Sequence, residues 1–71
     1  ELSDREKEIV CSVAQGLSNK QIADKHFISI HTVITHRRNI SRKLGIHSSA
    51  GLVVYAILNK LVTIDELRLN A

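Results

Sequence analysis

Signals that start and stop helices recur along this chain at short intervals, and they constrain its fold more than any other feature. Ser3 is followed three residues later by Glu6, a spacing at which each side chain satisfies a free backbone N–H of the other in a capping box. Apolar residues then recur every three or four positions until Gly16, which suits a left-handed helix end. The pattern predicts a first helix over residues 4–15.

The same signals predict two more helices that follow closely. Ser18 and Gln21 form a second capping box, so a short helix should begin there and end near residue 26. Ser29 is an N-cap candidate for a longer helix over residues 30–44. Gly45, directly after residue 44, ends this helix. A short helix, a tight turn and a longer basic helix form the helix-turn-helix arrangement.

A fourth helix and a last turn complete the prediction. Either Ser48 or Ser49 caps a helix over residues 50–60, and Thr63 with Glu66 opens a final turn. The sequence therefore predicts an all-α fold, a four-helix bundle that contains a helix-turn-helix.

Length and composition agree with one small helical domain over residues 1–71. The chain has no Pro, three Gly, one Tyr and one Phe, whereas a β-sandwich or barrel would need more aromatic and turn residues. Its single Cys excludes an internal disulfide. No apolar run approaches the roughly 20 residues of a membrane span, so we expect a cytoplasmic domain without a membrane partner.

Charge is distributed unevenly along the chain. Residues 1–24 hold five acids and three bases, but residues 25–64 hold six bases and no acid, and four of these bases lie between positions 37 and 43. Such a region favours an anionic partner, and nucleic acid is the first candidate. The alternative is a basic face that only keeps the domain in solution.

The predicted basic helix has one buried and one exposed stripe. Val33, Ile40 and Leu44 fall on the buried stripe, with Arg37 at its flank. The opposite stripe carries methyl-bearing, polar and guanidinium groups of the kind that contact base edges in a major groove. Its members are His31, Ile34, Thr35, Arg38 and Arg42. Phosphates would run along its margins, at Thr32, Asn39 and Lys43, and at the start of the preceding helix, at Ser18, Asn19 and Lys20.

At the level of whole motifs, residues 1–61 resemble the LuxR-type (NarL/FixJ-like) DNA-binding domain of bacterial transcription regulators. The matching runs are Leu2-Ser3-x-Arg5-Glu6-x-Glu8-Ile9, Ala14-x-Gly16-Leu17-Ser18-Asn19-Lys20-Gln21-Ile22-Ala23 and Ile28-Ser29-x-x-Thr32-Val33-x-x-His36-x-x-Asn39-Ile40-x-x-Lys43-Leu44-Gly45-Ile46. The resemblance implies sequence-specific binding of double-stranded DNA, with the third helix in the major groove and the second braced over the backbone. It implies base contacts from Ile34, Thr35 and Arg38, and backbone contacts from Ser18, Asn19, Lys20, Thr32, His36, Asn39 and Lys43.

Two positions depart from the family pattern. Many members have Lys directly after the Thr-Val pair, where this chain has Ile34, so a polar base contact is absent there. Many also have Arg near the start of the fourth helix, where this chain has Ser49, so the role of that Arg is missing or moved. Both departures bear on the DNA sequence that the domain prefers.

The predicted fourth helix is apolar almost all the way round over residues 52–58. If Leu52, Ala56 and Leu61 fill the core, part of the remaining apolar set must stay exposed and could form a binding surface. The resemblance implies a two-fold dimer through this helix, and the alternative is a completely buried helix. The candidate interface residues are Val53, Val54, Ile57 and Leu58.

Other classes of function find little support in the sequence. The four His residues are spaced by five, five and eleven positions, which misses the i, i+4 spacing of metal ligands on a helix. Paired carboxylates and a Gly-rich phosphate loop are absent, so we expect no enzyme, metal, cofactor or small-molecule ligand. The alternative function is a protein-interaction module that uses the apolar fourth helix, and a further variant is the DNA-contacting module of a sigma factor.

The resemblance also implies a setting for the domain. It predicts the C-terminal output domain of a longer regulator, such as a response regulator, that acts as a homodimer on DNA, with RNA polymerase as a further partner.

Overall fold

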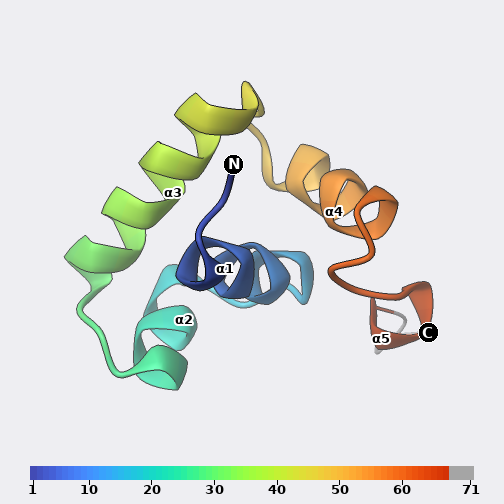
Figure 1. Ribbon diagram of the computed structural model, residues 1–71. Coiled ribbons are helices and arrows are strands. Elements are labelled where there is room, and N and C mark those ends of the chain that lie inside the picture. The colour runs from blue at the N-terminus through green and yellow to red at the C-terminus, as the bar shows by residue number, and fades with distance from the viewer. Residues whose placement is uncertain (68–71) are drawn as a thin grey trace.

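The computed structural model describes residues 1–67, which are helical without a strand among them (Figure 1). The four predicted helices are present, and the last predicted turn is a fifth, four-residue helix. The all-α prediction is therefore confirmed. The elements are α1 (Asp4–Ala14), α2 (Asn19–His26), α3 (Ile30–Leu44), α4 (Ser49–Leu58) and α5 (Ile64–Leu67).

The helix starts follow the capping signals of the sequence. The Ser3 backbone N–H donates to Glu6 Oε1 at 2.8 Å, and the Glu6 N–H donates to Ser3 Oγ at 3.1 Å. The second capping box has the same two distances at the start of α2. Ser48 caps α4, which therefore begins one residue earlier and ends two residues earlier than the predicted range of 50–60. Gly16 has a φ of 87°, the left-handed conformation expected after α1.

The core is built around α1, which packs against α2, α3 and α4. Figure 1 shows α3 and α4 as two sides of an arch over α1, joined at the top by residues 45–48. The expected core positions Leu52 and Ala56 are buried, but Leu61 is only half-buried and Val62 is buried in its place. The chain leaves α4 through a turn, so the helical spacing that predicted Leu61 no longer applies there. Other buried apolar residues include Ile9, Val10, Ile22, Val33 and Ile40.

Phe27 closes α2 in an unusual conformation. Its φ of 58° lies in the left-handed region, which costs a residue other than Gly about 1 kcal/mol. The turn allows the Ile28 N–H to donate to the Ala23 carbonyl at 3.0 Å, and it directs the Ile28 side chain against the core. The Phe27 side chain is left 93% exposed. The backbone conformation of Phe27, and not the packing of its side chain, therefore brings Ile28 to the core.

Candidate nucleic-acid interface

The predicted exposed stripe of α3 is exposed in the structure. Five side chains lie on one side of the helix, while Val33 and Ile40 on the other side are fully buried. We call this surface the α3 face, and its members are His31, Ile34, Thr35, Arg38 and Arg42. A single helix thus presents methyl, hydroxyl, imidazole and guanidinium groups side by side.

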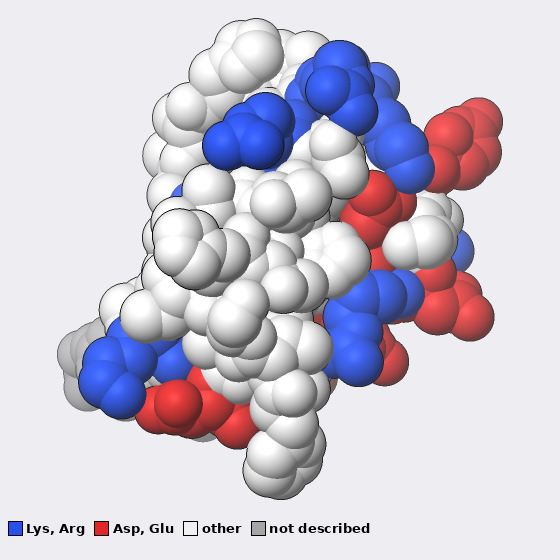
Figure 2. Space-filling model, turned by 90° about the vertical axis from the view of Figure 1, so that its left-hand side faces the viewer, with Lys and Arg blue, Asp and Glu red and all other residues white. Residues whose placement is uncertain are grey.

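Figure 2 looks at the side of the molecule on which α3 lies. Uncharged atoms fill the centre of this view, and basic groups gather at its upper end. Acidic groups lie along its right-hand edge and at its lower left, with further basic groups beside them in both places. Because bases are uncharged and phosphates are anionic, an uncharged centre beside basic groups suits a duplex that lies against this side.

The predicted backbone contacts lie around the α3 face, and several already have partners within the protein. Lys20 forms an exposed ion pair with Asp24 at 3.4 Å. Asn39 Oδ1 accepts from Arg42 Nη2 at 2.6 Å, and the Thr32 and Ser29 hydroxyls are 2.9 Å apart. Ser18 accepts from the Gln21 N–H and Asn19 from Arg37, both at the start of α2, while His36 lies on a middle turn of α3. These local bonds order the side chains next to the α3 face.

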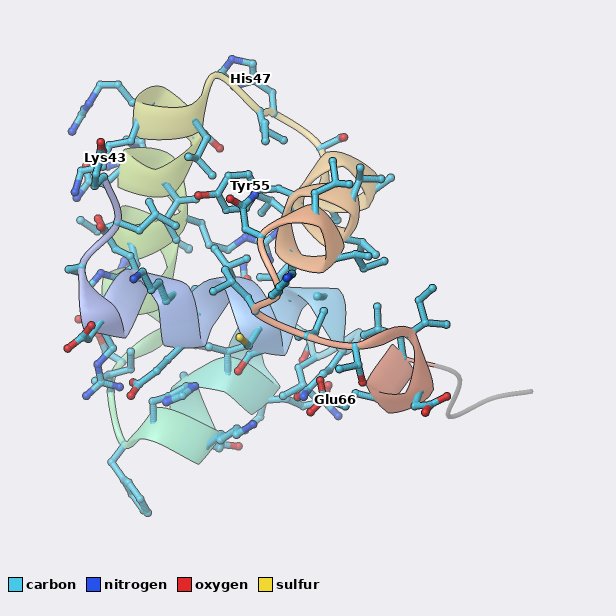
Figure 3. The ribbon with its side chains drawn as sticks, turned by 45° about the vertical axis from the view of Figure 1, so that its right-hand side comes forward. Lys43, His47, Tyr55 and Glu66 are labelled. Carbon is cyan, nitrogen blue, oxygen red and sulfur yellow. The ribbon has the colours of Figure 1, made fainter. Side chains whose placement is uncertain are left out.

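Lys43 has a structural partner that the sequence did not reveal. Its Nζ lies 2.8 Å from Glu6 Oε1 and 3.5 Å from the Glu1 carbonyl oxygen, at the end of α3 beside the N-terminal segment (Figure 3). The Lys43 hydrogen bond is the main reason that the pKa of Glu6 is lowered, and the Ser3 N–H adds to it. Glu6 is 5% exposed, so Lys43 balances a buried carboxylate. A phosphate contact from Lys43 stays a prediction.

Arg37 joins three helices, a role that its place beside the buried stripe did not predict. Its Nη1 donates to Asn19 Oδ1 at 2.8 Å, and its Nη2 donates to Ser49 Oγ at 3.1 Å. Asn19 is the first residue of α2 and Ser49 the first of α4. The sequence signal was the departure from the family pattern at position 49, where the Ser49 hydroxyl accepts from Arg37.

His26 braces α2 against α1. Its Nε2 is 3.1 Å from the hydroxyl of buried Ser12, and its Nδ1 is 4.0 Å from Glu8 Oε1. Burial lowers the pKa of His26, and the nearby charge of Arg5 adds to this effect while that of Glu8 opposes it. The fold therefore favours the neutral imidazole.

This pKa predicts a loss of stability in mild acid. The unfolded chain binds a proton near the ordinary value of 6.5, but folded His26 resists it, so the stabilising contribution is present above about pH 6.5 and lost as pH falls below. Thermal unfolding followed by circular dichroism should show a lower melting temperature at pH 5.5 than at pH 7.5. His26→Leu should flatten this difference, whereas His47→Ala, in an exposed loop position, should preserve it. An unchanged pH profile in His26→Leu would contradict the prediction.

Part of the apolar surface of α4 is exposed. Val54 is 55% exposed and Leu58 is 74% exposed, while Val53 and Ile57 are half-buried against the core. The prediction that some of these four residues stay exposed is confirmed, and the alternative of a completely buried helix is wrong. Tyr55 points from α4 towards α3 (Figure 3), where it lines a hollow with Lys43 and Leu44.

Two kinds of site are absent from the part of the chain that the structure describes. In residues 1–67, no three His, Cys, Asp or Glu side chains gather in a way that could hold a metal ion. None of the helices described here has the length and apolar character needed to cross a membrane.

A short helix and a longer exposed basic helix, packed on a common support, define a helix-turn-helix domain of DNA-binding transcription regulators. The profile of the luxR family of bacterial regulatory proteins (GerE) matches residues 1–56, and the chain belongs to this family. The oxygen regulatory protein NreC of Staphylococcus aureus (strain JH9) is 48% identical over 61 residues, which are 86% of this chain and 28% of NreC.

A solved structure agrees with this assignment. The response regulator ChrA of a heme-sensing two component system superposes with a TM-score of 0.78 and 44% sequence identity over 87% of this chain and 31% of that chain. The chain thus spans less than a third of the length of NreC and of ChrA.

Proposed function

We propose that this domain binds double-stranded DNA sequence-specifically, with α3 in the major groove. The observation that carries the proposal is the α3 face, whose five members are exposed together on one helix. Arg38 can donate two hydrogen bonds to a guanine, and the methyl groups of Ile34 and Thr35 can contact a thymine methyl. These three residues would read bases.

Backbone contacts would hold α3 in register. Polar and basic groups on the Lys43 margin of α3 can donate to phosphates, and the first turn of α2 adds backbone N–H groups. Because basic groups displace counterions from DNA, the affinity should fall steeply with salt. The proposed contacts are Ser18, Asn19, Lys20, Thr32, His36, Asn39 and Lys43, with His31 and Arg42 facing the groove.

Dimerisation would proceed through α4. The side chains of Val54 and Leu58 are exposed, and half-buried Val53 and Ile57 lie beside them. Together they form an apolar surface on α4 that is separate from the α3 face. A two-fold pairing of this surface would place two α3 helices on successive half-sites of an inverted repeat.

The relatives support a proposal about the setting of the domain. NreC and ChrA are each more than three times as long as the matched region, and ChrA is a response regulator. We therefore assign this chain as the output domain of a longer response regulator that controls transcription in the bacterial cytoplasm and acts with RNA polymerase.

The test is selection from a randomised duplex pool at two salt concentrations, with the retained duplexes sequenced. An inverted repeat among them would support specific dimeric recognition. Retention that depends on salt but yields no common sequence would contradict the base-reading assignment. No retention at low salt would contradict DNA binding and would favour α4 as a protein-interaction surface.

Arg38→Ala tests base reading directly. The change should cost about 1–3 kcal/mol on the selected duplex and much less on a random duplex, because only the base contact carries sequence information. Fluorescence anisotropy with both duplexes measures the difference. Lys25→Ala, which removes one exposed charge from α2, is the matched control and should weaken both duplexes alike. Equal losses for Arg38→Ala on both duplexes would show that Arg38 does not read a base.

A further inference from the structure

Helices α3 and α4 depend on α1 for their relative position. Each packs on α1, and Figure 1 shows them diverging from the connection at residues 45–48. Because the proposed DNA contacts lie on α3 and the proposed dimer contacts on α4, the angle between these two helices determines the distance between the two half-sites that a dimer can reach.

Arg37 is placed to fix that angle. It lies on the margin of α3 opposite Lys43, and its guanidinium donates to the first residue of α2 and the first residue of α4. A guanidinium holds its donors in a rigid, planar fork, so two bonds to two helices restrict both at once. Bonds from a charged donor are also about twice as strong as neutral ones.

Neither bond neutralises the guanidinium charge. Asn19 and Ser49 are uncharged acceptors, and no carboxylate in residues 1–67 pairs with Arg37. Two neutral acceptors at the starts of two helices indicate a group that sets geometry.

From these contacts we propose that Arg37 is a positioning residue. Through Asn19 it holds the start of α2 beside α3, and through Ser49 it sets the orientation of α4 relative to α3, so that it determines the half-site spacing that the dimer accepts. This inference rests on the proposed function, and it adds a source of specificity that touches no base.

Two variants separate the proposal from a general loss of stability. Ser49→Ala removes only the bond to α4 at an exposed position, and Arg37→Lys keeps the charge but loses the fork. Binding is measured on a single half-site and on inverted repeats whose half-sites are one base pair closer or farther apart. These duplexes derive from the sequence selected by the wild-type chain.

The wild-type chain should lose about tenfold in affinity for each base pair inserted or removed, because one base pair both rotates and shifts a half-site. Ser49→Ala and Arg37→Lys should reduce this discrimination to about threefold, and Ser49→Ala should change single half-site affinity less than about twofold. Lys25→Ala, with one exposed charge removed, should keep the wild-type spacing profile. Unchanged spacing profiles in both Ser49→Ala and Arg37→Lys would overturn the proposal.

A measurement without DNA keeps this proposal distinct from the proposed function. Residual dipolar couplings of backbone N–H groups report the relative orientation of α3 and α4 in the free chain. The two variants should show a changed or averaged orientation with each helix intact. If the wild-type chain selects no duplex, DNA binding fails and these couplings alone decide whether Arg37 positions α4, and an unchanged orientation would overturn its role.

Discussion

Leu58→Asp is expected to lower the affinity for an inverted repeat about a hundredfold while leaving the domain folded. Leu58 is 74% exposed in the free chain, so a charge there costs little stability, but it would be desolvated in a dimer that pairs α4 with α4. A hundredfold loss corresponds to about 2.7 kcal/mol, which is within the range of central apolar interface residues. Anisotropy titrations on the repeat and on a single half-site measure the effect.

A matched variant outside α4 provides the control. Ile64 on α5 is 67% exposed, and Ile64→Asp introduces the same charge at a similarly exposed apolar position. It should leave the affinity for the inverted repeat almost unchanged, and Leu58→Asp should leave the affinity for a single half-site unchanged. Equal losses for both variants on the repeat would contradict an α4 interface.

Lys43→Ala is expected to destabilise the domain by about 1–2 kcal/mol and to weaken binding to all duplexes alike. The stability loss arises because Glu6, 5% exposed, keeps the Ser3 N–H but loses its ammonium partner. The loss is smaller than for a fully buried pair, since the Lys43 side chain is 40% exposed and water can replace it. Urea unfolding and anisotropy on selected and random duplexes measure the two effects.

The Glu6–Lys43 pair should also make the stability of the domain depend on pH in acid. The folded pKa of Glu6 is below its ordinary value of 4.5, so its contribution is complete above that pH and disappears as pH falls further. Lys43→Ala should reduce this acid-dependent loss.

Glu6→Gln separates the two roles of Lys43. It should also lower stability, but it frees the ammonium and should not weaken DNA binding. If Glu6→Gln weakens DNA binding as much as Lys43→Ala, Lys43 affects DNA only through the fold.

The local structure could be predicted because its causes lie within four residues. Ser3 with Glu6, and Ser18 with Gln21, form their capping boxes as the spacing predicts. Phe27 is a local exception, as is Lys60 with a φ of 60°, since neither side chain indicates a left-handed backbone. Position 27 takes that conformation because α2 must end before Ile28 can reach the core.

The side-chain partners of the candidate interface could not be predicted, because they are distant in sequence. Glu6 and Lys43 are 37 residues apart, and Arg37 reaches Asn19 across 18 residues. A helical wheel places Arg37 and Lys43 on opposite margins of α3 but cannot show which helix lies beside each margin. The exposed and buried stripes of α3 were predictable, whereas the contacts that hold α3 to its neighbours required the three-dimensional structure.

The exposure of Phe27 makes the helix-turn-helix turn accessible to spectroscopy. The chain contains no Trp, and the Phe27 side chain is 93% exposed at the junction of α2 and α3. Phe27→Trp would therefore introduce the only Trp of the chain without removing a core contact, and the backbone would keep its left-handed conformation. Excitation at the red edge of the absorption band would select this Trp over Tyr55. The emission of this Trp and its accessibility to an aqueous quencher would report the environment of this one turn, with no dye attached to the protein.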